Sequence, residues 1–169
     1  MTTLEYLNAA NEESFVSTIA FAFEDSPWIA RAAAARRPFA DLAALHAAMV
    51  GVVQAADPVS QVALIAAHPD LAGRVAREGR LGAASTAEQA AAGLDALTPS
   101  EIARFDADNA AYRARFGFPF VICAREHDKT SILAELQRRG QNERSDEIAT
   151  ALEEIAKIAR LRLEAVVRR

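Results

Sequence analysis

The sequence contains a single cysteine, Cys123, so it cannot form an intramolecular disulfide, and we expect a protein of a reducing compartment. Basic residues are not in excess: 19 lysines and arginines stand against 23 aspartates and glutamates, for a net charge of −4. This balance argues against a binder of nucleic acid or of an anionic membrane, whose surface would be basic.

The most apolar stretch, residues 42–56, is interrupted by His46, Gly51 and Gln54. It falls short of the roughly 18 to 20 apolar residues that span a bilayer. The first residues also lack the basic and apolar segments of a secretory signal. We therefore expect no membrane association and a cytoplasmic location.

Motifs of common enzyme chemistry are missing as well. The chain has no glycine-rich phosphate loop of the GxxxxGK[ST] or GxGxxG type and no GxSxG nucleophile turn. His46, His68 and His127 lie far apart and have no HExxH or CxxC partner, so no metal site is expected. Without an internal repeat or a low-complexity linker, residues 1–169 are expected to form one domain.

Alanine is abundant and alternating β-branched residues are scarce, which favours helix almost everywhere. Caps and prolines predict about eight helices, at residues 12–23, 27–37, 42–54, 58–67, from 85, 99–115, 129–139 and from 145 nearly to the end. Residues 69–84 are predicted to be a long connection. The apolar run FGFPFVICA, 116–124, has a central proline and is predicted to be a buried extended segment. The expected fold class is an all-α, single-domain bundle.

His68 precedes Pro69, and a residue before proline is pushed out of the α region, so His68 should close the helix that begins at Pro58. The partial negative charge of a helix C-terminus favours the imidazolium form. A histidine there could hold a proton and deliver it, or it could simply offset the helix dipole.

Arg162 lies on an apolar stripe of the last helix. Turning by about 100° per residue places Arg162 within roughly 40° of the centre of this stripe and Arg160 well away from it. A buried guanidinium needs a carboxylate of the protein or a ligand, unless it reaches back to solvent. The stripe consists of Ile148, Leu152, Ile155, Ala159 and Val166.

Ser85 and Glu88 have the spacing of a capping box, which would be a purely structural role. The free N–H groups at such a helix start could instead bind an anion. Pairs of arginines at 36–37, 138–139 and 168–169 are interpreted as solvated charges near helix C-termini.

Four patterns follow one another along the chain. They are HPxLAG at His68 to Gly73, SxxEQ…AGL at Ser85 to Leu94, NxxYxxxFGFPFVICxR at Asn109 to Arg125 and IxxLRL at Ile158 to Leu163. Together they resemble the signatures of the 2-oxo-4-hydroxy-4-carboxy-5-ureidoimidazoline (OHCU) decarboxylase family. The match runs in order over about residues 60–165, and the first and third signatures are the most specific.

The resemblance implies a carboxy-lyase that converts OHCU to (S)-allantoin in urate breakdown, with no metal or organic cofactor, in a homodimeric all-α protein. It implies that His68, Glu88 and Arg162 are catalytic. It also implies substrate-binding roles, for Glu88 and Arg162 again and for Pro69, Ser85, Phe118, Phe120, Val121 and Ile122.

Two other readings of the same residues stay open. The chain could be a helical dimerisation or regulatory module without chemistry, in which case Arg162 should find an internal carboxylate and no cavity should surround His68. It could also be an accessory domain that works beside a hydrolase of the allantoin pathway, although its length argues mildly against a fusion.

Overall fold

The computed structural model describes residues 1–24, 26–72 and 82–168, and most of them are helical, as the alanine-rich sequence predicts. The chain divides into two compact units. The first contains residues 1–67 and 156–169, and the second contains residues 68–155. The predicted connection at 69–84 lies largely outside the described residues.

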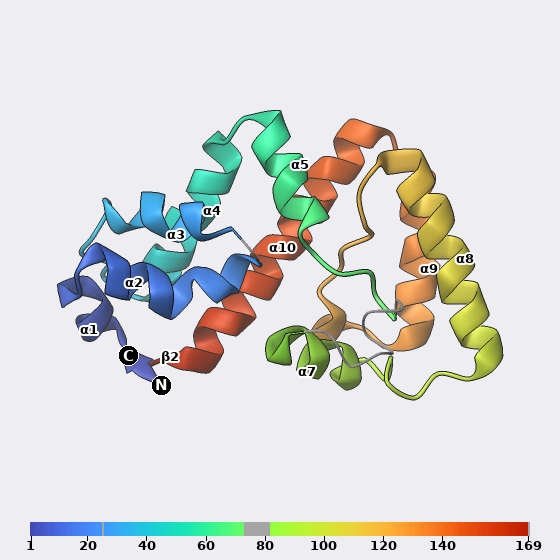
Figure 1. Cartoon of the computed structure of the whole chain (residues 1–169), viewed down its shortest axis with the longest axis horizontal. Helices are drawn as coiled ribbons and strands as arrows, with labels where there is room; N and C mark the ends of the chain where they lie inside the picture. Colours follow the sequence, from blue (N-terminus) through green and yellow to red (C-terminus); the bar gives the residue numbers. More distant parts are fainter. Residues whose placement is uncertain (25, 73–81, 169) are drawn as a thin grey trace. The chain divides into compact units, whose positions relative to one another are not determined.

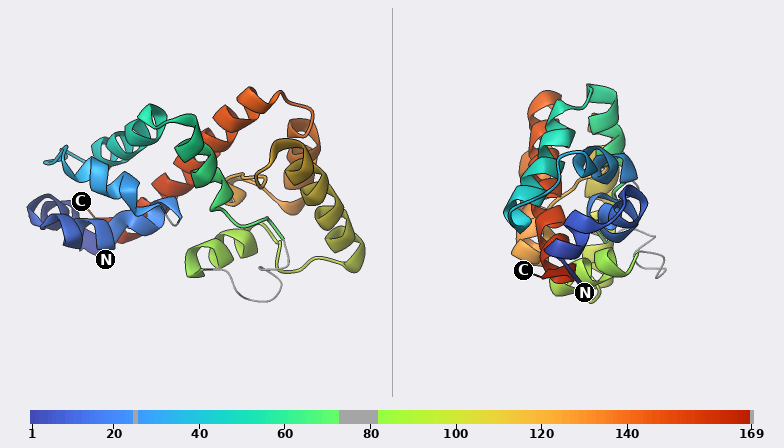
Figure 2. Two further views of the ribbon diagram at one scale, coloured as in Figure 1. Left: turned by 45° about the horizontal axis from the view of Figure 1, so that its top comes forward. Right: turned by 90° about the vertical axis from the view of Figure 1, so that its left-hand side faces the viewer.

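The first unit is built from the N-terminal helices and the C-terminal end of the last helix. Helix α2 packs on α3, and α3 packs on α4 (Figure 1). The strands β1 and β2 form a two-stranded parallel pair that brings the two ends of the chain together, as both views in Figure 2 show. The elements are β1 (Thr2–Thr3), α1 (Leu4–Ala9), α2 (Glu12–Ile19), the 3-10 helix η1 (Ala20–Phe23), α3 (Pro27–Ala34), α4 (Leu42–Ala55), α5 (Pro58–Ala66) and β2 (Val167–Arg168).

The predicted helix starts in this unit are confirmed by their caps. Asn11 accepts a hydrogen bond from the backbone N–H of Ser14, Asp41 from that of Ala44, and Asp57 from two N–H groups of α5. These side chains satisfy donors that a helix leaves open in its first turn. The predicted helix to residue 37 is wrong at its end. It stops at Ala34, and the turn before Pro38 is closed by shorter i to i+3 hydrogen bonds.

The second unit contains α7, α8, η2 and α9, together with the first half of α10, whose second half belongs to the first unit. Helices α8 and α9 lie side by side (Figures 1 and 2). The capping box of Thr98 and Glu101 is present, and Asp128 caps α9 as predicted. The bounds are α7 (Ala83–Ala91), α8 (Pro99–Phe116), η2 (Ala124–Glu126), α9 (Lys129–Arg139) and α10 (Arg144–Val166).

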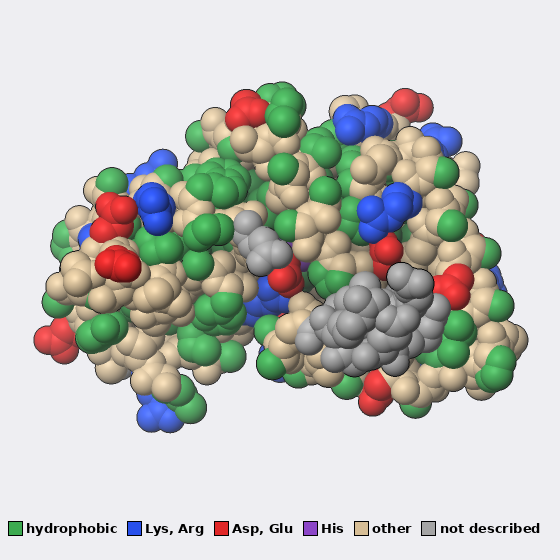
Figure 3. All heavy atoms as spheres, in the orientation of Figure 1, with side chains coloured by type: hydrophobic (Ala, Val, Ile, Leu, Met, Phe, Trp, Pro, Cys, Tyr) green, Lys and Arg blue, Asp and Glu red, His purple; other side chains and the backbone are tan. Residues whose placement is uncertain are grey.

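The all-α class is confirmed. Nine α-helices lie within the described ranges, and the sequence reasoning missed α1, whose Thr3 cap accepts from Tyr6. In the same ranges no single helix has the length and apolar composition of a membrane span. Helices α4 and α5 have that length and composition only when taken together, and the chain bends by 118° between them. Figure 3 shows acidic and basic side chains interspersed on one face of the described chain.

Candidate active site

His68 opens the second unit, directly after Ala67, the C-cap of α5. The prediction that the helix ends at this point is confirmed. The imidazole is buried, with 5% of the residue exposed. A plain dipole-offsetting histidine would be expected in solvent, so its burial favours a site role over that alternative.

The loop after His68 is held by side chains from two other helices. Asn109 Nδ2 of α8 donates to the Leu71 carbonyl oxygen at 2.9 Å, and the N–H of Ala72 donates to Gln89 Oε1 of α7 at 2.9 Å. Both bonds are buried, where a lost hydrogen bond is expensive. Arg113 also pairs with Asp70 at 2.8 Å, so the three successive loop residues Asp70, Leu71 and Ala72 are all anchored.

Ala72 confirms that these anchors constrain the backbone. It has φ of +52°, in the left-handed region that a residue with a Cβ rarely adopts. Such a conformation costs about 1 kcal/mol or more and persists only where surrounding contacts impose it. The anchors therefore fix the path of the chain immediately after His68.

The capping box predicted at Ser85 and Glu88 is wrong. Helix α7 begins two residues earlier, at Ala83, its N-cap is Gly82, and no side chain caps it. Ser85 is therefore already inside the helix and is buried, and Glu88 is one turn further along and half-buried. The capping-box explanation for these two residues is thereby removed.

Ser85, Glu88 and Gln89 share one face of α7, because residues three and four apart on a helix are neighbours. Gln89 is also buried and holds the loop after His68. Helix α7 contacts η2, the short helix that follows the segment 118–123. One helix thus contacts both the histidine loop and the helix η2 that follows the apolar segment.

The predicted buried segment is confirmed for residues 118–123, which are neither helix nor strand. Its ends are shorter than predicted: Phe116 ends α8 with Gly117 in the left-handed region at φ +80°, and Ala124 begins η2. All of the predicted pocket residues in it are buried, namely Phe118, Phe120, Val121 and Ile122.

Arg139 corrects the interpretation of the arginine pairs. It is 1% exposed and pairs with the fully buried Glu147, with Nε of Arg139 2.9 Å from Oε1. Arg138, its neighbour, is exposed and pairs with Glu135, as expected of a solvated charge. Sequence reasoning also missed Glu147 and the buried Glu154. The two lie seven residues apart on one face of α10, but that face is more than about 100° from the centre of the apolar stripe, as far as the exposed Arg160. Helical phase therefore could not have found them.

Tyr112 completes this cluster by donating its hydroxyl hydrogen to Glu147. Burial raises the pKa of the Tyr112 hydroxyl, and the carboxylate of Glu147 raises this pKa further. Asn142 donates to the other carboxylate oxygen of Glu147 at 2.9 Å. The buried charge is therefore fully surrounded by donors.

Arg162 belongs to the first unit and is 5% exposed, whereas the Arg160 side chain is 65% exposed. The helical-phase prediction is confirmed, and the alternative that Arg162 reaches solvent is wrong. Its Nη2 lies 2.8 Å from Glu24 Oε1, and its Nη1 donates to the Phe21 carbonyl oxygen at 3.2 Å.

The pairing of Arg162 with Glu24 meets the criterion set for a module without chemistry. That criterion alone does not distinguish an enzyme from a module without chemistry. A guanidinium has five N–H donors, so an internal carboxylate does not by itself exclude a ligand. The Glu24 side chain is also 21% exposed, and a partly solvated carboxylate can yield its place to a substrate anion.

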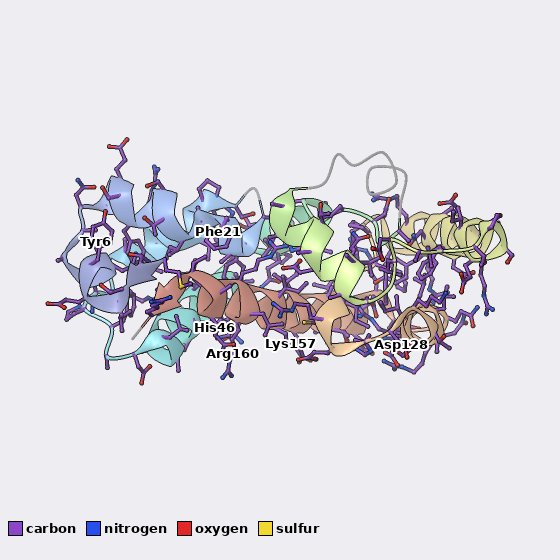
Figure 4. The ribbon with its side chains drawn as sticks, turned by 90° about the horizontal axis from the view of Figure 1, so that it is seen from below. Tyr6, Phe21, His46, Asp128, Lys157 and Arg160 are labelled. Atoms are coloured by element: carbon purple, nitrogen blue, oxygen red, sulfur yellow. The ribbon has the colours of Figure 1, made fainter. Side chains whose placement is uncertain are left out.

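A cavity of about 1010 Å³ in the first unit contains none of the predicted site residues. Its lining includes His46 of α4 and Arg160 of α10, which Figure 4 labels close together. His46 Nε2 lies 2.8 Å from the Ala156 carbonyl oxygen, which ties α4 to α10.

The second unit thus contains His68, Ser85, Glu88 and the apolar segment, and the first contains Arg162. Within the described ranges, no three histidine, cysteine, aspartate or glutamate side chains are grouped so that they could hold a metal ion. The site residues can move a proton at an imidazole, accept N–H donors at a carboxylate and bind an anion at a guanidinium.

Comparisons with known proteins agree with the resemblance. The model of the family described as OHCU decarboxylase matches residues 8–164. A 2-oxo-4-hydroxy-4-carboxy-5-ureidoimidazoline decarboxylase of Haloferax volcanii is 40% identical and the match covers 95% of this chain and 94% of that protein. The uric acid degradation bifunctional protein PucL of Bacillus subtilis is 38% identical over 99% of this chain, which spans 33% of PucL. The crystal structure of an (S)-allantoin synthase matches with a TM-score of 0.79 and 28% identity, over 99% of this chain and 54% of the other.

Proposed function

The chain belongs to the OHCU decarboxylase family, and we propose that it converts OHCU to (S)-allantoin in urate breakdown without a cofactor. The observation that carries the proposal is the buried His68, on a loop anchored at three successive residues beside a helix that presents Ser85 and Glu88. The family match over nearly the whole chain supports the reaction class, a carboxy-lyase.

The chemistry explains why no cofactor is needed. In OHCU the carboxylate is attached to a carbon that also bears a hydroxyl, next to a ring C=N carbon that bears the ureido group. When CO₂ leaves, the electron pair of the broken C–C bond forms a C=C bond to the ureido-bearing carbon. The π pair of the C=N moves onto the ring nitrogen, which takes up a proton from solvent, and an enol forms. The hydroxyl proton then leaves as the carbonyl forms, and a proton adds to the ureido-bearing carbon. The substrate therefore supplies the electron sink that a cofactor supplies elsewhere.

Three residues are proposed to be catalytic. His68 takes the hydroxyl proton and returns one to carbon, which fits a buried imidazole. Glu88 accepts the ureido and ring N–H donors, because an ionised carboxylate is an acceptor only. Arg162 binds the substrate carboxylate or the developing oxyanion, for which a planar guanidinium is suited.

The remaining pocket residues are proposed to contact substrate. Pro69 follows His68 directly, and Ser85 precedes Glu88 by three residues on the same helix face. In the apolar segment, backbone groups are proposed to bind the substrate's polar edge, while the buried side chains exclude water. These segment residues are Phe118, Phe120, Val121 and Ile122.

We further propose that residues 1–169 act as one domain, because the family match includes residues of both units. The family resemblance supports a homodimer. The single cysteine and the net charge of −4 support a cytoplasmic protein without a nucleic-acid or membrane partner. The match to one third of PucL supports a related arrangement in which such a domain is part of a bifunctional protein. For the present chain, a gel-filtration mass equal to two chains would support the dimer.

The proposed function is tested with fresh substrate. OHCU is generated from urate with the two upstream enzymes, this protein is added, and allantoin formation is followed by circular dichroism. We expect faster formation of optically active (S)-allantoin, unchanged by EDTA. Racemic allantoin at the uncatalysed rate would refute the function, and loss of activity to EDTA with recovery on adding one metal would refute the cofactor-free mechanism.

A further inference from the structure

The apolar segment 118–123 presents a problem that helices do not have. It is buried, yet it lies in neither helix nor strand, so no regular ladder of backbone hydrogen bonds satisfies it. Buried backbone N–H and C=O groups must find partners elsewhere. In this protein charged side chains of α9 and α10 are among those partners.

Three such bonds hold the segment and the end of helix α8 before it. Arg139 Nη1 donates to the Val121 carbonyl oxygen at 2.8 Å. The N–H of Cys123 donates to Glu154 Oε2 at 2.8 Å, and Arg144 Nε donates to the Phe116 carbonyl oxygen at 3.3 Å. These charged side chains supply hydrogen bonds that a neighbouring strand would supply in a sheet.

Arg139 contacts two residues of the predicted pocket. Besides Val121 it touches Phe120, with its guanidinium carbon 4.5 Å from the ring centroid. Its Nε and Nη2 both donate to Glu147, which fixes the plane of the guanidinium. One rigid group thus sets both the aromatic ring of Phe120 and the carbonyl of Val121.

Stability alone does not account for a buried ion pair. Removing two charges from water is costly, and apolar replacements of similar volume are often as stable or more stable. What the pair provides that apolar residues cannot is direction: the fork of Arg139 points one donor at one carbonyl.

From these contacts we infer that Arg139, oriented by Glu147, is a positioning residue that fixes the backbone of Phe120 and Val121 for substrate binding. The inference rests on the proposed function for its catalytic consequence. Arg139 itself does not touch the reacting atoms; it acts through the segment. Its position just before Gly140 at the end of α9 gives no hint of this role in the sequence.

Two variants separate positioning from stability. Arg139→Met with Glu147→Gln removes both buried charges together. The glutamine keeps an oxygen for Tyr112, and the Asn142 amide can turn its own oxygen towards the new NH₂ group. Arg139→Lys keeps the positive charge beside Glu147 but lacks the fork that reaches both Glu147 and Val121. The single variant Arg139→Met leaves the Glu147 carboxylate buried without its counter-charge and should melt well below the other two.

The matched control is Arg138→Met with Glu135→Gln, the same exchange in the exposed pair one residue earlier on α9. For each variant we would measure the melting temperature, kcat and KM for OHCU, the pH profile of kcat, and amide hydrogen exchange of residues 118–123. The exchange measurement does not depend on turnover.

We expect the double variant and Arg139→Lys to melt somewhat below the wild type, because the buried Val121 carbonyl loses its donor, but well above Arg139→Met, with kcat/KM lowered at least tenfold. The pH profile should keep its shape, and amides of 118–123 should exchange faster. The control should match the wild type in all four. Unchanged kcat/KM and exchange in these variants would overturn the inference, and so would activity that follows melting temperature across all variants. An inactive wild type would refute the proposed function instead, while the exchange result would still decide whether Arg139 positions the segment.

Discussion

Asn109 donates a hydrogen bond of 2.9 Å to the carbonyl oxygen of Leu71, 38 residues earlier in the chain, and both residues are buried. This bond connects the long helix α8 to the loop that follows His68. Because a buried carbonyl without a donor is costly, the bond restricts the loop to one path.

Replacing Asn109 by alanine should therefore loosen this loop. The Leu71 carbonyl would lose its donor, and we expect a loss of about 1–3 kcal/mol in the free energy of unfolding, with lower kcat/KM. Urea denaturation and steady-state kinetics measure the two effects. Gln137→Ala, which removes only an exposed contact of α9 with Asp108, is the control and should change neither.

His68→Asn should abolish turnover and leave the fold intact. Asparagine is accepted just beyond a helix end, but it cannot exchange a proton as imidazole does. We expect kcat to fall by about a hundredfold or more, the lower range of general acid–base contributions. Circular dichroism should show unchanged helicity. A folded variant with wild-type kcat would show that His68 is only structural.

Arg162→Lys should be severely impaired, although it keeps the positive charge. Lysine cannot direct two separate N–H groups at Glu24 and at the Phe21 carbonyl, nor grip a carboxylate with two parallel bonds. Loss of a charge-assisted hydrogen bond corresponds to about tenfold or more in kcat/KM. Arg160→Lys is the control, because Arg160 is exposed and pairs only with Glu164 in the described contacts. Equal kinetics in both variants would disprove the helical-phase argument.

Glu88→Gln tests the charge of this side chain. Capping does not complicate the test, because the N-cap position of α7 is Gly82 and Glu88 does not cap the helix. One oxygen becomes NH₂, which would face the substrate's N–H donors. A hydrogen bond to a charged group is worth about 1.5–3 kcal/mol, so activity should fall on the order of a hundredfold. Thermal melting should remain near wild type. Normal turnover would exclude Glu88 from the catalytic set.

Glu101→Gln is the control for that variant, and it has its own pH dependence. Hydrogen bonds from Lys129 and from the Thr98 backbone lower the pKa of Glu101 to about 2. A lowered pKa stabilises the fold above the ordinary value near 4.5, and this contribution is lost as the pH falls toward about 2. The variant should melt slightly below wild type at pH 7, converge with it near pH 2, and retain full activity.

Tyr112→Phe should change how stability responds to alkaline pH. Burial and the Glu147 carboxylate raise the pKa of Tyr112 above its ordinary value of 10. Above that value the unfolded chain ionises first, so the folded protein loses stability as the pH rises through 10 and beyond. Phenylalanine removes this dependence. Between pH 9 and 11 the melting temperature of the variant should therefore rise relative to that of the wild type. A constant difference would contradict the assignment.

Local sequence patterns predict much of the helical fold correctly. Asn11, Asp41, Asp57, Thr98 and Asp128 all cap helices where predicted, because a cap is a short-range interaction between a side chain and N–H groups two or three residues away. The same rule failed at Ser85, since the capping-box spacing can also occur inside a helix.

Helical phase predicted the burial of Arg162, and the signature around His68 identified the buried loop residue. The first rests on the 3.6-residue period of a helix, which dictates which side chains share a face, and the second on the place of His68 before Pro69 in the family's signature. The family's other residues came from resemblance rather than from physical reasoning.

Only the tertiary structure revealed which distant groups meet. Arg139 looked like a solvated charge at a helix end, and its burial depends on Glu147 of the next helix and on the carbonyl of Val121. Likewise, the anchoring of Leu71 by Asn109 spans 38 residues. Periodicity fixes the face on which a residue lies, but the energy of a buried charge is decided by the groups opposite it. Those groups come from other elements, and only the packing of the helices brings them within hydrogen-bonding distance.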